Sequence, residues 1–597
     1  TTGNIVLSGG LSDTAAAYAA LDGIVTAELI AITARVSDVA ITVTDAATVA
    51  QFNTIDGETT GNIVLSGGLI ELIPITGTTG DDTLIVLANT DFVQADAGTD
   101  TVVFSGNYAD YTFSQSDSYV SVMTHNTTGH AVSLYGVEQL QFDYTTASLT
   151  TEFRVNTYTS SIQEDPSITA LSDGGFMVTW ESWGGQDGSF GGTYAQIYDT
   201  DGNSVDDEFQ VNTYTPNGQQ NPSVAELDNG NVIIGWNSHY QVTTGGSIQA
   251  QLYNADGKSI GSEFEIDDNT LNSSHGPEIA ALSNGDFVMT WWDWTGNTGG
   301  TAQYSVNAQI YDSDGNSSGS QWQVTSGESS TWHPDSTYVL PAVAALADGN
   351  FVIVSSGVSA QIYNASGNTV GSAFQVNTAT VSGQSHPCIA ALNNGGFVIA
   401  WESGLTTGSS KGHIGAQMYD ASGNADGSEF RVNTVNDLQQ RNPSIDSFTN
   451  GEFVITWESG DYFYVTDSTA TQDGSNVGVY AQRYNANGTK NGSEFQVNTY
   501  TTNNQQDPEV ATLSNGGFVI SWESAGQDGD GKNVYAQRYD AEGNAVGEAT
   551  LVELSGSAAD LVLALSGTVT EHTVTVYVTD APTTSQLIAI NAATTGS

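Results

Sequence analysis

The chain has 597 residues, which is too long for a single hydrophobic core, so we expect several units. Its 10 Lys and Arg face 67 Asp and Glu, and the formal net charge of −57 excludes a nucleic-acid binder and disfavours an anionic membrane surface. The 11 Trp, 25 Tyr and 20 Phe are too many for a disordered acidic chain, so the protein is predicted to be folded, β-rich and strongly solvated.

Repeats of one kind lie near the two ends of the chain. The segment TTGNIVLSGGL at Thr1–Leu11 recurs at Thr59–Leu69, and residues 44–61 share the frame T-D-A-x-T-x-x-Q-x-x-x-I-x-x-x-T-T-G with residues 579–596. The aspartate of this frame is typical of a helix N-cap, and a short β-branched strand precedes it. The pattern predicts α/β solenoid-like repeats that stack on one another and continue beyond both ends of this sequence.

Residues 77–103 form three nonapeptides in tandem, GTTGDDTLI, VLANTDFVQ and ADAGTDTVV. Each copy has an aspartate at its sixth position. Calcium prefers six to eight oxygen ligands, and a tight turn supplies backbone carbonyls while aspartate supplies charge. The eighth position is apolar in every copy and is predicted to point into a core; its residues are Leu84, Val93 and Val102.

These nonapeptides resemble the haemolysin-type calcium repeat (RTX, G-G-x-G-x-D-x-U-x), and residues 104–151 resemble the strand-rich segment that follows such repeats. In that family two nonapeptides form one coil, so the resemblance implies a short β-roll with one well-formed calcium site between residues 77–82 and 95–100. It also implies type I secretion and calcium-dependent folding outside the cell, as in the giant repeat-rich RTX surface proteins of marine bacteria and cyanobacteria. The alternative is a degenerate roll that has lost its ion. The implied metal ligands are Gly77, Thr79, Gly80, Asp82, Asp91, Ala95, Ala97, Gly98 and Asp100.

Residues 152–550 contain one passage seven times, most legible as Ala-Gln-x-Tyr at intervals of 52 to 65 residues. Each copy holds four short segments with strand-like alternation, separated by Gly-containing turns. Four strands in each of seven copies predict a seven-bladed β-propeller, with an open row of β-modules as the alternative. The segment Glu152–Thr157 precedes the first blade and is predicted to supply the missing strand of the last one. The glutamines of the motif are Gln196, Gln251, Gln309, Gln361, Gln417, Gln482 and Gln537.

Trp-Glu-Ser ends the second strand in four copies. The tryptophan is predicted to be a wedge between blades and the glutamate a hydrogen-bonding partner of the next blade, because catalytic carboxylates need unlike environments rather than equivalent copies. The alternative is a sugar-stacking platform with a catalytic acid. The seven glutamines are predicted to form a hydrogen-bonded belt that sets blade geometry, or alternatively to ring a channel. The glutamates concerned are Glu181, Glu402, Glu458 and Glu523.

Further candidate sites lie outside these motifs. Asp-Gly pairs after the second strand could coordinate calcium or form solvated turns without an ion; their aspartates are Asp187, Asp473, Asp528 and Asp530. Tryptophans that depart from the repeat frame could bind a ligand; these are Trp183, Trp292, Trp294 and Trp332. The histidines lack zinc-ligand spacing, and the single cysteine, Cys388, excludes an internal disulfide and is predicted to be buried.

The chain is therefore interpreted as mainly β. A seven-bladed propeller at 152–550 is inserted between α/β solenoid-like repeats at 1–76 and 551–597, with an RTX β-roll at 77–103 and a β-hairpin segment at 104–151. We expect a non-enzymatic, secreted, calcium-stabilised structural component of a bacterial cell-surface layer, sheath or filament. The expected partners are other copies or neighbouring repeats of the same protein, and glycan or cell-surface polysaccharide, with no nucleic acid and no membrane span. An adhesin whose propeller binds glycan or a partner protein is the alternative, and a propeller glycosidase or lyase is less favoured.

Overall fold

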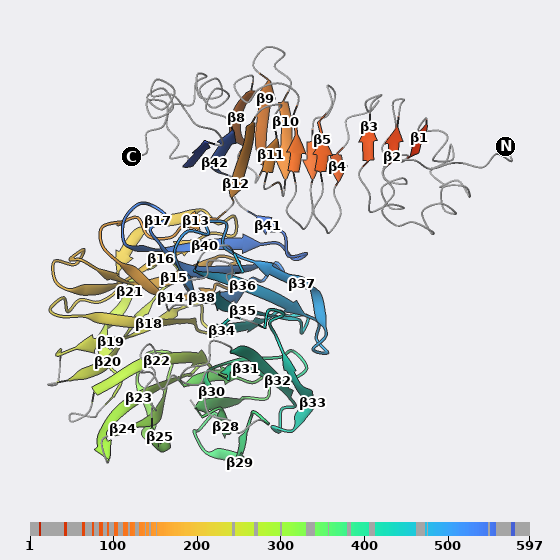
Figure 1. Ribbon diagram of the computed structural model, residues 1–597. Helices are drawn as coiled ribbons and strands as arrows, with labels where there is room; N and C mark the ends of the chain where they lie inside the picture. Colours follow the sequence, from red (N-terminus) through yellow and green to blue (C-terminus); the bar gives the residue numbers. More distant parts are fainter. Residues whose placement is uncertain are drawn as a thin grey trace. The chain divides into compact units, whose positions relative to one another are not determined.

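The computed structural model describes residues 152–546 apart from gaps at 242–244, 268–272, 299–300, 330–340, 356, 379–383, 405–411, 437, 461–471 and 474–475. Elsewhere it describes the strands given below and a few residues beside them. The chain divides into two compact units, Thr1–Thr151 together with Gly543–Ser597, and Glu152–Glu542 (Figure 1). All regular elements of this described part are strands, and none of its residues belongs to a helix that is long and apolar enough to cross a membrane.

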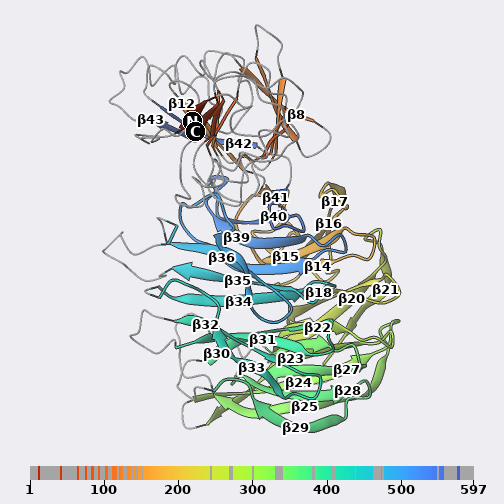
Figure 2. The same ribbon diagram turned by 90° about the vertical axis from the view of Figure 1, so that its right-hand side faces the viewer.

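The second unit is a seven-bladed β-propeller, which confirms the predicted repeat architecture (Figures 1 and 2). Each blade is an antiparallel sheet of four strands, and the innermost strands of successive blades lie side by side until β38 of blade 7 meets β14 of blade 1. Blades 1 to 3 consist of β14 (Gln163–Ala170), β15 (Phe176–Trp183), β16 (Gly191–Tyr198), β17 (Ser204–Gln210), β18 (Gln219–Glu226), β19 (Val232–His239), β20 (Gly246–Tyr253), β21 (Ser259–Glu265), β22 (Ser273–Ala281), β23 (Phe287–Thr298), β24 (Thr301–Tyr311) and β25 (Ser317–Ser329).

Blades 4 to 6 consist of β26 (Ala342–Ala345), β27 (Asn350–Ser355), β28 (Ser359–Asn364), β29 (Thr369–Gln375), β30 (Gln384–Ala391), β31 (Phe397–Ser403), β32 (His413–Tyr419), β33 (Ala425–Arg431), β34 (Gln440–Ser447), β35 (Phe453–Gly460), β36 (Val477–Tyr484) and β37 (Lys490–Gln496). Blade 7 consists of β38 (Gln505–Thr512), β39 (Phe518–Ala525), β40 (Lys532–Tyr539) and β13 (Phe153–Arg154), and β41 (Ala545–Val546) follows it in the chain.

The ring closes through its own N-terminal strand, as predicted. β13 pairs antiparallel with β40, with Phe153 opposite Ala536, and the Val155 amide donates to the Val534 carbonyl at 2.8 Å. The Thr499 amide of the preceding blade donates to Glu152 Oε2 at 2.8 Å. Residues far apart in the sequence therefore complete the last blade, and the ring has no free terminal sheet.

Apolar side chains fill the space between neighbouring blades. Trp180 of blade 1 is fully buried in one cluster with Leu513 of blade 7, and Trp401 of blade 5 packs in the same way with Val352 of blade 4. In every blade except blade 2, a phenylalanine near the start of the second strand stacks on the tyrosine of Ala-Gln-x-Tyr, for example Phe176 on Tyr198 with ring centroids 4.7 Å apart. The predicted wedge role of the tryptophans is confirmed.

The repeated glutamines act within their own blades. Gln251 Nε2 donates to the carbonyls of Leu252 and Ile260, each at 2.9 Å, and the other six glutamines also donate to the carbonyl of the residue that follows them. In blades 1 to 6 the pairing of the third and fourth strands shifts register at this glutamine. The side chain thus satisfies carbonyls that a β-bulge leaves unpaired. The belt that sets blade geometry is confirmed, and the channel ring is wrong.

The first unit contains three sheets. β1, β2 and β3 pair in parallel; a second sheet has the order β4-β6-β10-β9-β8 and a third the order β43-β42-β12-β11-β7-β5. Their bounds are β1 (Leu11–Asp13), β2 (Ile41–Val43), β3 (Ile63–Leu65), β4 (Pro74–Thr76), β5 (Thr83–Ile85), β6 (Phe92–Gln94), β7 (Thr101–Val103), β8 (Tyr111–Ser116), β9 (Val120–His125), β10 (Ala131–Tyr135), β11 (Gln139–Gln141), β12 (Thr145–Thr150), β42 (Thr550–Gly556) and β43 (Thr575–Val578).

The nonapeptide strands pair with a constant offset. Pro74 of β4 lies opposite Phe92 of β6, and Thr83 of β5 lies opposite Thr101 of β7, so parallel partners are 18 residues apart. At the eighth nonapeptide position Val93 and Val102 are fully buried and Leu84 is partly buried. The nonapeptide turns that carry the implied metal ligands lie outside the described residues, as do the helices predicted in the end repeats.

Candidate functional site

The innermost strand of each described blade except blade 4 carries an unusual residue directly before a proline. In these six strands that residue has a positive φ, between 45° and 59°. The residue before proline is normally extended, and a left-handed backbone favours Gly, Asn and Asp. The pairing with the second strand shifts register at the same place, as at a β-bulge. The six residues are Asp165, Asn221, Gly276, His386, Asn442 and Asp507.

The glutamates of Trp-Glu-Ser fasten these residues to the preceding blade. The Asp165 amide donates to Glu523 Oε1 at 2.8 Å and the Asn442 amide to Glu402 Oε1 at 2.8 Å. The Asp507 amide donates to Glu458 Oε1 at 2.6 Å. All four glutamates are almost fully buried. Glu181 Oε1 likewise accepts from Gln220 Nε2 of blade 2 at 3.0 Å, so the predicted hydrogen bonding of each glutamate with the next blade is confirmed.

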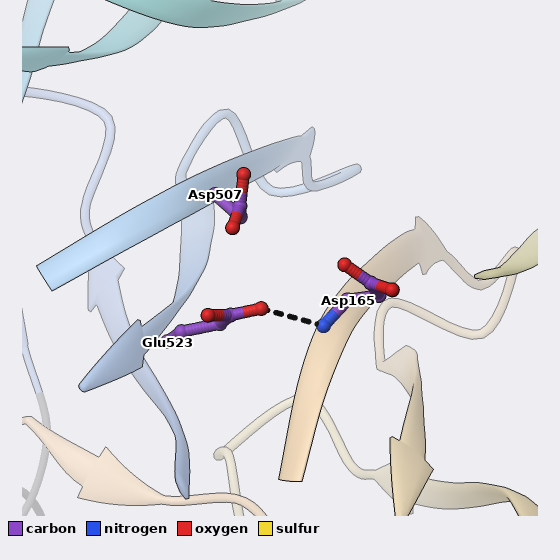
Figure 3. A group of neighbouring side chains, drawn as sticks. All are labelled: Asp165, Asp507 and Glu523. Atoms are coloured by element: carbon purple, nitrogen blue, oxygen red, sulfur yellow. Dashed lines mark hydrogen bonds between the residues drawn. The ribbon is translucent and has the colours of Figure 1, made fainter. Parts of the chain in front are cut away.

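Three carboxyl groups from blades 7 and 1 converge where the innermost strands β38 and β14 lie side by side, and Figure 3 shows these side chains together. Oxygens of Asp165, Asp507 and Glu523 all lie within 4.8 Å of one another. Two amides orient the aspartates, because Asn221 Nδ2 donates to Asp165 Oδ2 at 2.9 Å and Asn442 Nδ2 donates to Asp507 Oδ1 at 2.7 Å. We call Asp165, Asp507 and Glu523 the axial triad.

The negative charges of the carboxyl groups in and around the axial triad are only partly neutralised by positively charged side chains. Lys532 Nζ lies 2.8 Å from Glu523 Oε2 and 3.0 Å from Glu164 Oε2, and it is the one ammonium group in contact with these carboxylates in the described part of the chain. Burial, together with the charges of Asp507 and Glu164, raises the pKa of Asp165 to about 7. Burial and the charge of Asp165 also raise the pKa of Glu181 well above its usual range. Carboxyl groups of this kind keep protons at neutral pH unless a cation replaces them.

A second group of residues directly follows these prolines in the sequence. Glu278 of blade 3, Cys388 of blade 5, Ser444 of blade 6 and Glu509 of blade 7 each follow the proline of their strand. Ser444 Oγ donates to Glu509 Oε2 at 2.8 Å. Burial raises the pKa of Glu278 to about 8 and that of Glu509 to about 7, and the charge of Glu509 contributes to the rise at Glu278. Burial also raises the pKa of the Cys388 thiol well above its usual range.

Blade 5 neutralises its own carboxylate. His386 Nδ1 lies 3.3 Å from Glu402 Oε2. Burial alone would lower the His386 pKa, but the charge and hydrogen bond of Glu402 outweigh it and raise that pKa above its usual value. For Glu402, burial is likewise outweighed by His386, so its pKa is lowered. Blade 5 therefore holds an ion pair, whereas the carboxyl groups of blades 7 and 1 depend on protons, Lys532 or an added cation.

The predicted loop aspartates do not come together. Asp187 belongs to blade 1, Asp473 to blade 6, and Asp528 and Asp530 to blade 7, each within the loop of its own blade. Asp528 is held by Arg154 at 3.3 Å and by Asn533 Nδ2 at 2.9 Å, and Asp187 Oδ1 accepts from the Ser189 amide at 2.8 Å. These contacts are typical of closed turns.

The predicted ligand-binding tryptophans differ in accessibility. Trp292 is 5% exposed and stacks on His275 with ring centroids 4.6 Å apart, whereas Trp294 is 41% exposed near the end of β23. Trp183 is half-buried at the end of β15, and Trp332 lies outside the described residues. The axial triad was missed by sequence reasoning. The available signal was the repeated Pro in the first strand, with Asp, Asn, His or Gly before it.

No protein-family model matches the chain, and no curated protein matches it in sequence. Similar solved structures include a protein of unknown function from Dyadobacter fermentans, 8% identical, with a TM-score of 0.40 over 65% of this chain and 98% of that one. An α-L-arabinanase of Penicillium chrysogenum complexed with arabinobiose is 14% identical, with a TM-score of 0.37 over 66% of this chain and 99% of its own. The NanB sialidase of Streptococcus pneumoniae is 9% identical, with a TM-score of 0.34 over 66% of this chain and 69% of its own.

Proposed function

We propose that the protein is a secreted, calcium-stabilised structural component of a bacterial cell-surface layer, sheath or filament, and that it is not an enzyme. In this proposal the repeats of the first unit stack on other copies or neighbouring repeats of the same protein, and the propeller is a side module. The observation that carries the proposal is the 18-residue register of the parallel nonapeptide strands. This offset equals two nonapeptides, the period that the RTX resemblance implies for one coil.

The register supports a calcium site that involves Asp82 and Asp100. Because β5 and β7 are parallel and Thr83 lies opposite Thr101, each aspartate directly precedes the first residue of neighbouring strands at one edge of the sheet. Asp91 precedes β6 in the same way, but the strand beside β6 is β4, which is preceded by Ile73. In the sequence, an aspartate thus precedes both strands of the β5–β7 pair but only one strand of the β4–β6 pair, and calcium favours clustered carboxylate oxygens.

A non-enzymatic role is supported by the use of the repeated glutamates. Glu402, Glu458 and Glu523 each accept a backbone amide of the next blade, so they serve equivalent positions in the ring. A catalytic acid and its partner instead need different environments and access to a substrate.

The proposal is tested by melting the full chain in calcium and in chelator. Ions that bind only the folded state raise the melting temperature, so chelation is expected to lower it by several degrees and to expose residues 77–150 to proteolysis. The double variant Asp82→Asn with Asp100→Asn is expected to lose the calcium-dependent protection of residues 77–150 from proteolysis, while the matched control Asp91→Asn keeps it. A wild-type melting curve that is identical in chelator would remove calcium from the proposal. Electron microscopy in calcium tests assembly, and a compact monomer at all concentrations would contradict the structural role.

An adhesin is the second candidate, and exposed aromatic side chains favour it. Phe190, Tyr240 and Trp294 are 69%, 57% and 41% exposed, and they lie in or near the connection between the second and third strands of blades 1, 2 and 3. Connections at this point open on one face of a propeller, and exposed aromatics are typical of glycan or protein recognition. Binding to a glycan array that is lost in Trp294→Ala would support an adhesin, whereas binding that is absent in wild type or unchanged in the variant would contradict it.

A further inference from the structure

The carboxyl groups at the centre of the propeller carry more negative charge than the contacts around them neutralise. Asp165, Asp507 and Glu523 converge there, and Glu164 and Glu181 lie beside them. Lys532 compensates Glu523 and Glu164 by direct contact, while Asn221 and Asn442 offer the aspartates only neutral amides. Buried carboxylates without counter-charges are unfavourable, so this centre requires protons or a cation.

The spacing of the axial triad matches a calcium ion. Calcium–oxygen bonds measure about 2.3–2.6 Å, so two ligands of one ion lie at most about 5 Å apart. The triad oxygens lie within 4.8 Å of one another, and they come from β14, β38 and β39, which the ring holds in place. Glu523 already receives the Asp165 amide and Lys532, but each carboxylate oxygen has a second lone pair for a metal.

A separate observation also indicates a missing positive partner. The carboxyl group of Glu278 makes no hydrogen bond or ion pair with any described residue, although protein encloses it and the residue keeps only partial solvent contact. The charge that acts on this carboxyl group is that of Glu509, which is of the same sign. The charge of Asp507, the triad residue directly before Pro508 on the same strand, in turn raises the pKa of Glu509. The unpaired carboxyl group of Glu278 therefore interacts with Glu509, which interacts with the triad residue Asp507.

We propose that the centre of the propeller binds a calcium ion through Asp165, Asp507 and Glu523, and that the charges of Glu278 and Glu509 strengthen this binding. The site is distinct from the nonapeptides and draws its ligands from the first and last blades. Its ion joins the two blades at which the ring closes.

The test uses the full chain, calcium chloride and titration calorimetry after removal of bound metal. The axial variant carries Asp165→Asn and Asp507→Asn, which introduce the residue that blades 2 and 6 have at this position and preserve the left-handed backbone. The surface control carries Asp199→Asn and Asp420→Asn, which remove the same charge from exposed turns where other blades have Asn254 and Asn364. Both pairs are placed in wild type and in the Asp82→Asn, Asp100→Asn background, so that nonapeptide calcium is counted separately.

The axial variant is expected to lose one ion per chain, or to bind that ion at least about ten-fold more weakly, in both backgrounds. The surface control is expected to match its parent, and Glu278→Ser to show a smaller loss. Equal stoichiometry and affinity in the axial variant and its parent would overturn the proposal.

Hydrogen exchange on the wild type provides a test that needs no variant. Saturating calcium is expected to slow exchange in β14 and β38, which carry Asp165 and Asp507. Unchanged exchange in both strands would equally overturn the proposal. Loss of calcium binding to the nonapeptides alone leaves these outcomes unaffected, so the axial site and the proposed surface role fail independently.

Discussion

At the scale of single residues, the left-handed position before proline links the backbone to the central chemistry. Asn442 has a φ of 45°, and its side chain donates to Glu458 Oε1 at 2.9 Å and to Asp507 Oδ1 at 2.7 Å. The same residue therefore tolerates a conformation that most side chains avoid and holds two carboxylates in place. This combination explains why Asp, Asn, His and Gly alternate at one position of the repeat.

Replacing Asn442 separates the two contributions. We expect Asn442→Gly to lower the free energy of unfolding by about 2–3 kcal/mol, because it leaves two buried carboxylates without their donor. Asn442→Ala is expected to cost about 1–2 kcal/mol more, since alanine adds the strain of a left-handed backbone. Urea unfolding measures both values. Equal stability of the two variants would show that the backbone conformation carries no strain penalty.

At the scale of elements, the closing strand decides whether the blades form a ring. Asn156 follows β13; its Oδ1 accepts the Val534 amide at 2.8 Å and its Nδ2 donates to Asn533 Oδ1 at 2.6 Å. Asn212 is the matching residue after β17, and its Oδ1 accepts the Thr193 amide at 2.8 Å within blade 1. One asparagine joins distant parts of the sequence and the other joins near ones.

Asn156→Ala and Asn212→Ala are expected to lose similar amounts of stability, about 1–3 kcal/mol each, because each leaves a buried amide unpaired. Only Asn156→Ala is expected to increase hydrogen exchange in both β14 and β40, the strands on the two sides of the closure. Increased exchange at this closure in the Asn212→Ala variant as well would contradict a special role for the closing strand.

The strands and their grouping into blades were predictable because the repeat is local. Ala-Gln-x-Tyr marks the third strand of every blade, and the segment at Glu152–Thr157 reveals the closure through its likeness to the fourth strands. The axial triad could not be predicted, because Asp165 and Asp507 meet only after the ring has joined residues 342 positions apart. The residue pattern at the β-bulge, a proline preceded by Asp, Asn, His or Gly, recurs in six blades and does not show which of these residues meet.

At the scale of the whole molecule, the central carboxyl groups make propeller stability depend on pH. The pKa values of Asp165 and Glu509 rise to about 7 and that of Glu278 to about 8, all above those of the unfolded chain. The folded state therefore holds more protons than the unfolded state, and its stability falls as the pH rises through these values.

In chelator we expect the propeller to melt at a higher temperature at pH 5 than at pH 8. The axial variant Asp165→Asn with Asp507→Asn is expected to show a smaller difference between these two pH values, because two of the titrating groups are gone. Differential scanning calorimetry at both pH values measures the effect. A melting temperature that increases from pH 5 to pH 8 in wild type would show that other groups dominate.

The pairing of β12 with β42 has a further consequence for how such a chain can change over time. The polypeptide leaves the first unit after β12 and returns in β42, and these strands lie side by side from Thr145 opposite Gly556 to Thr150 opposite Thr550. In the sequence, the propeller thus connects two paired strands, as a hairpin turn would. Its own first strand, β13, pairs with β40 near its C-terminal end. Closing a long loop costs only slightly more entropy than closing a short one. A domain of this kind can be grafted into or excised from its host as a single cassette, with a tight turn left in its stead.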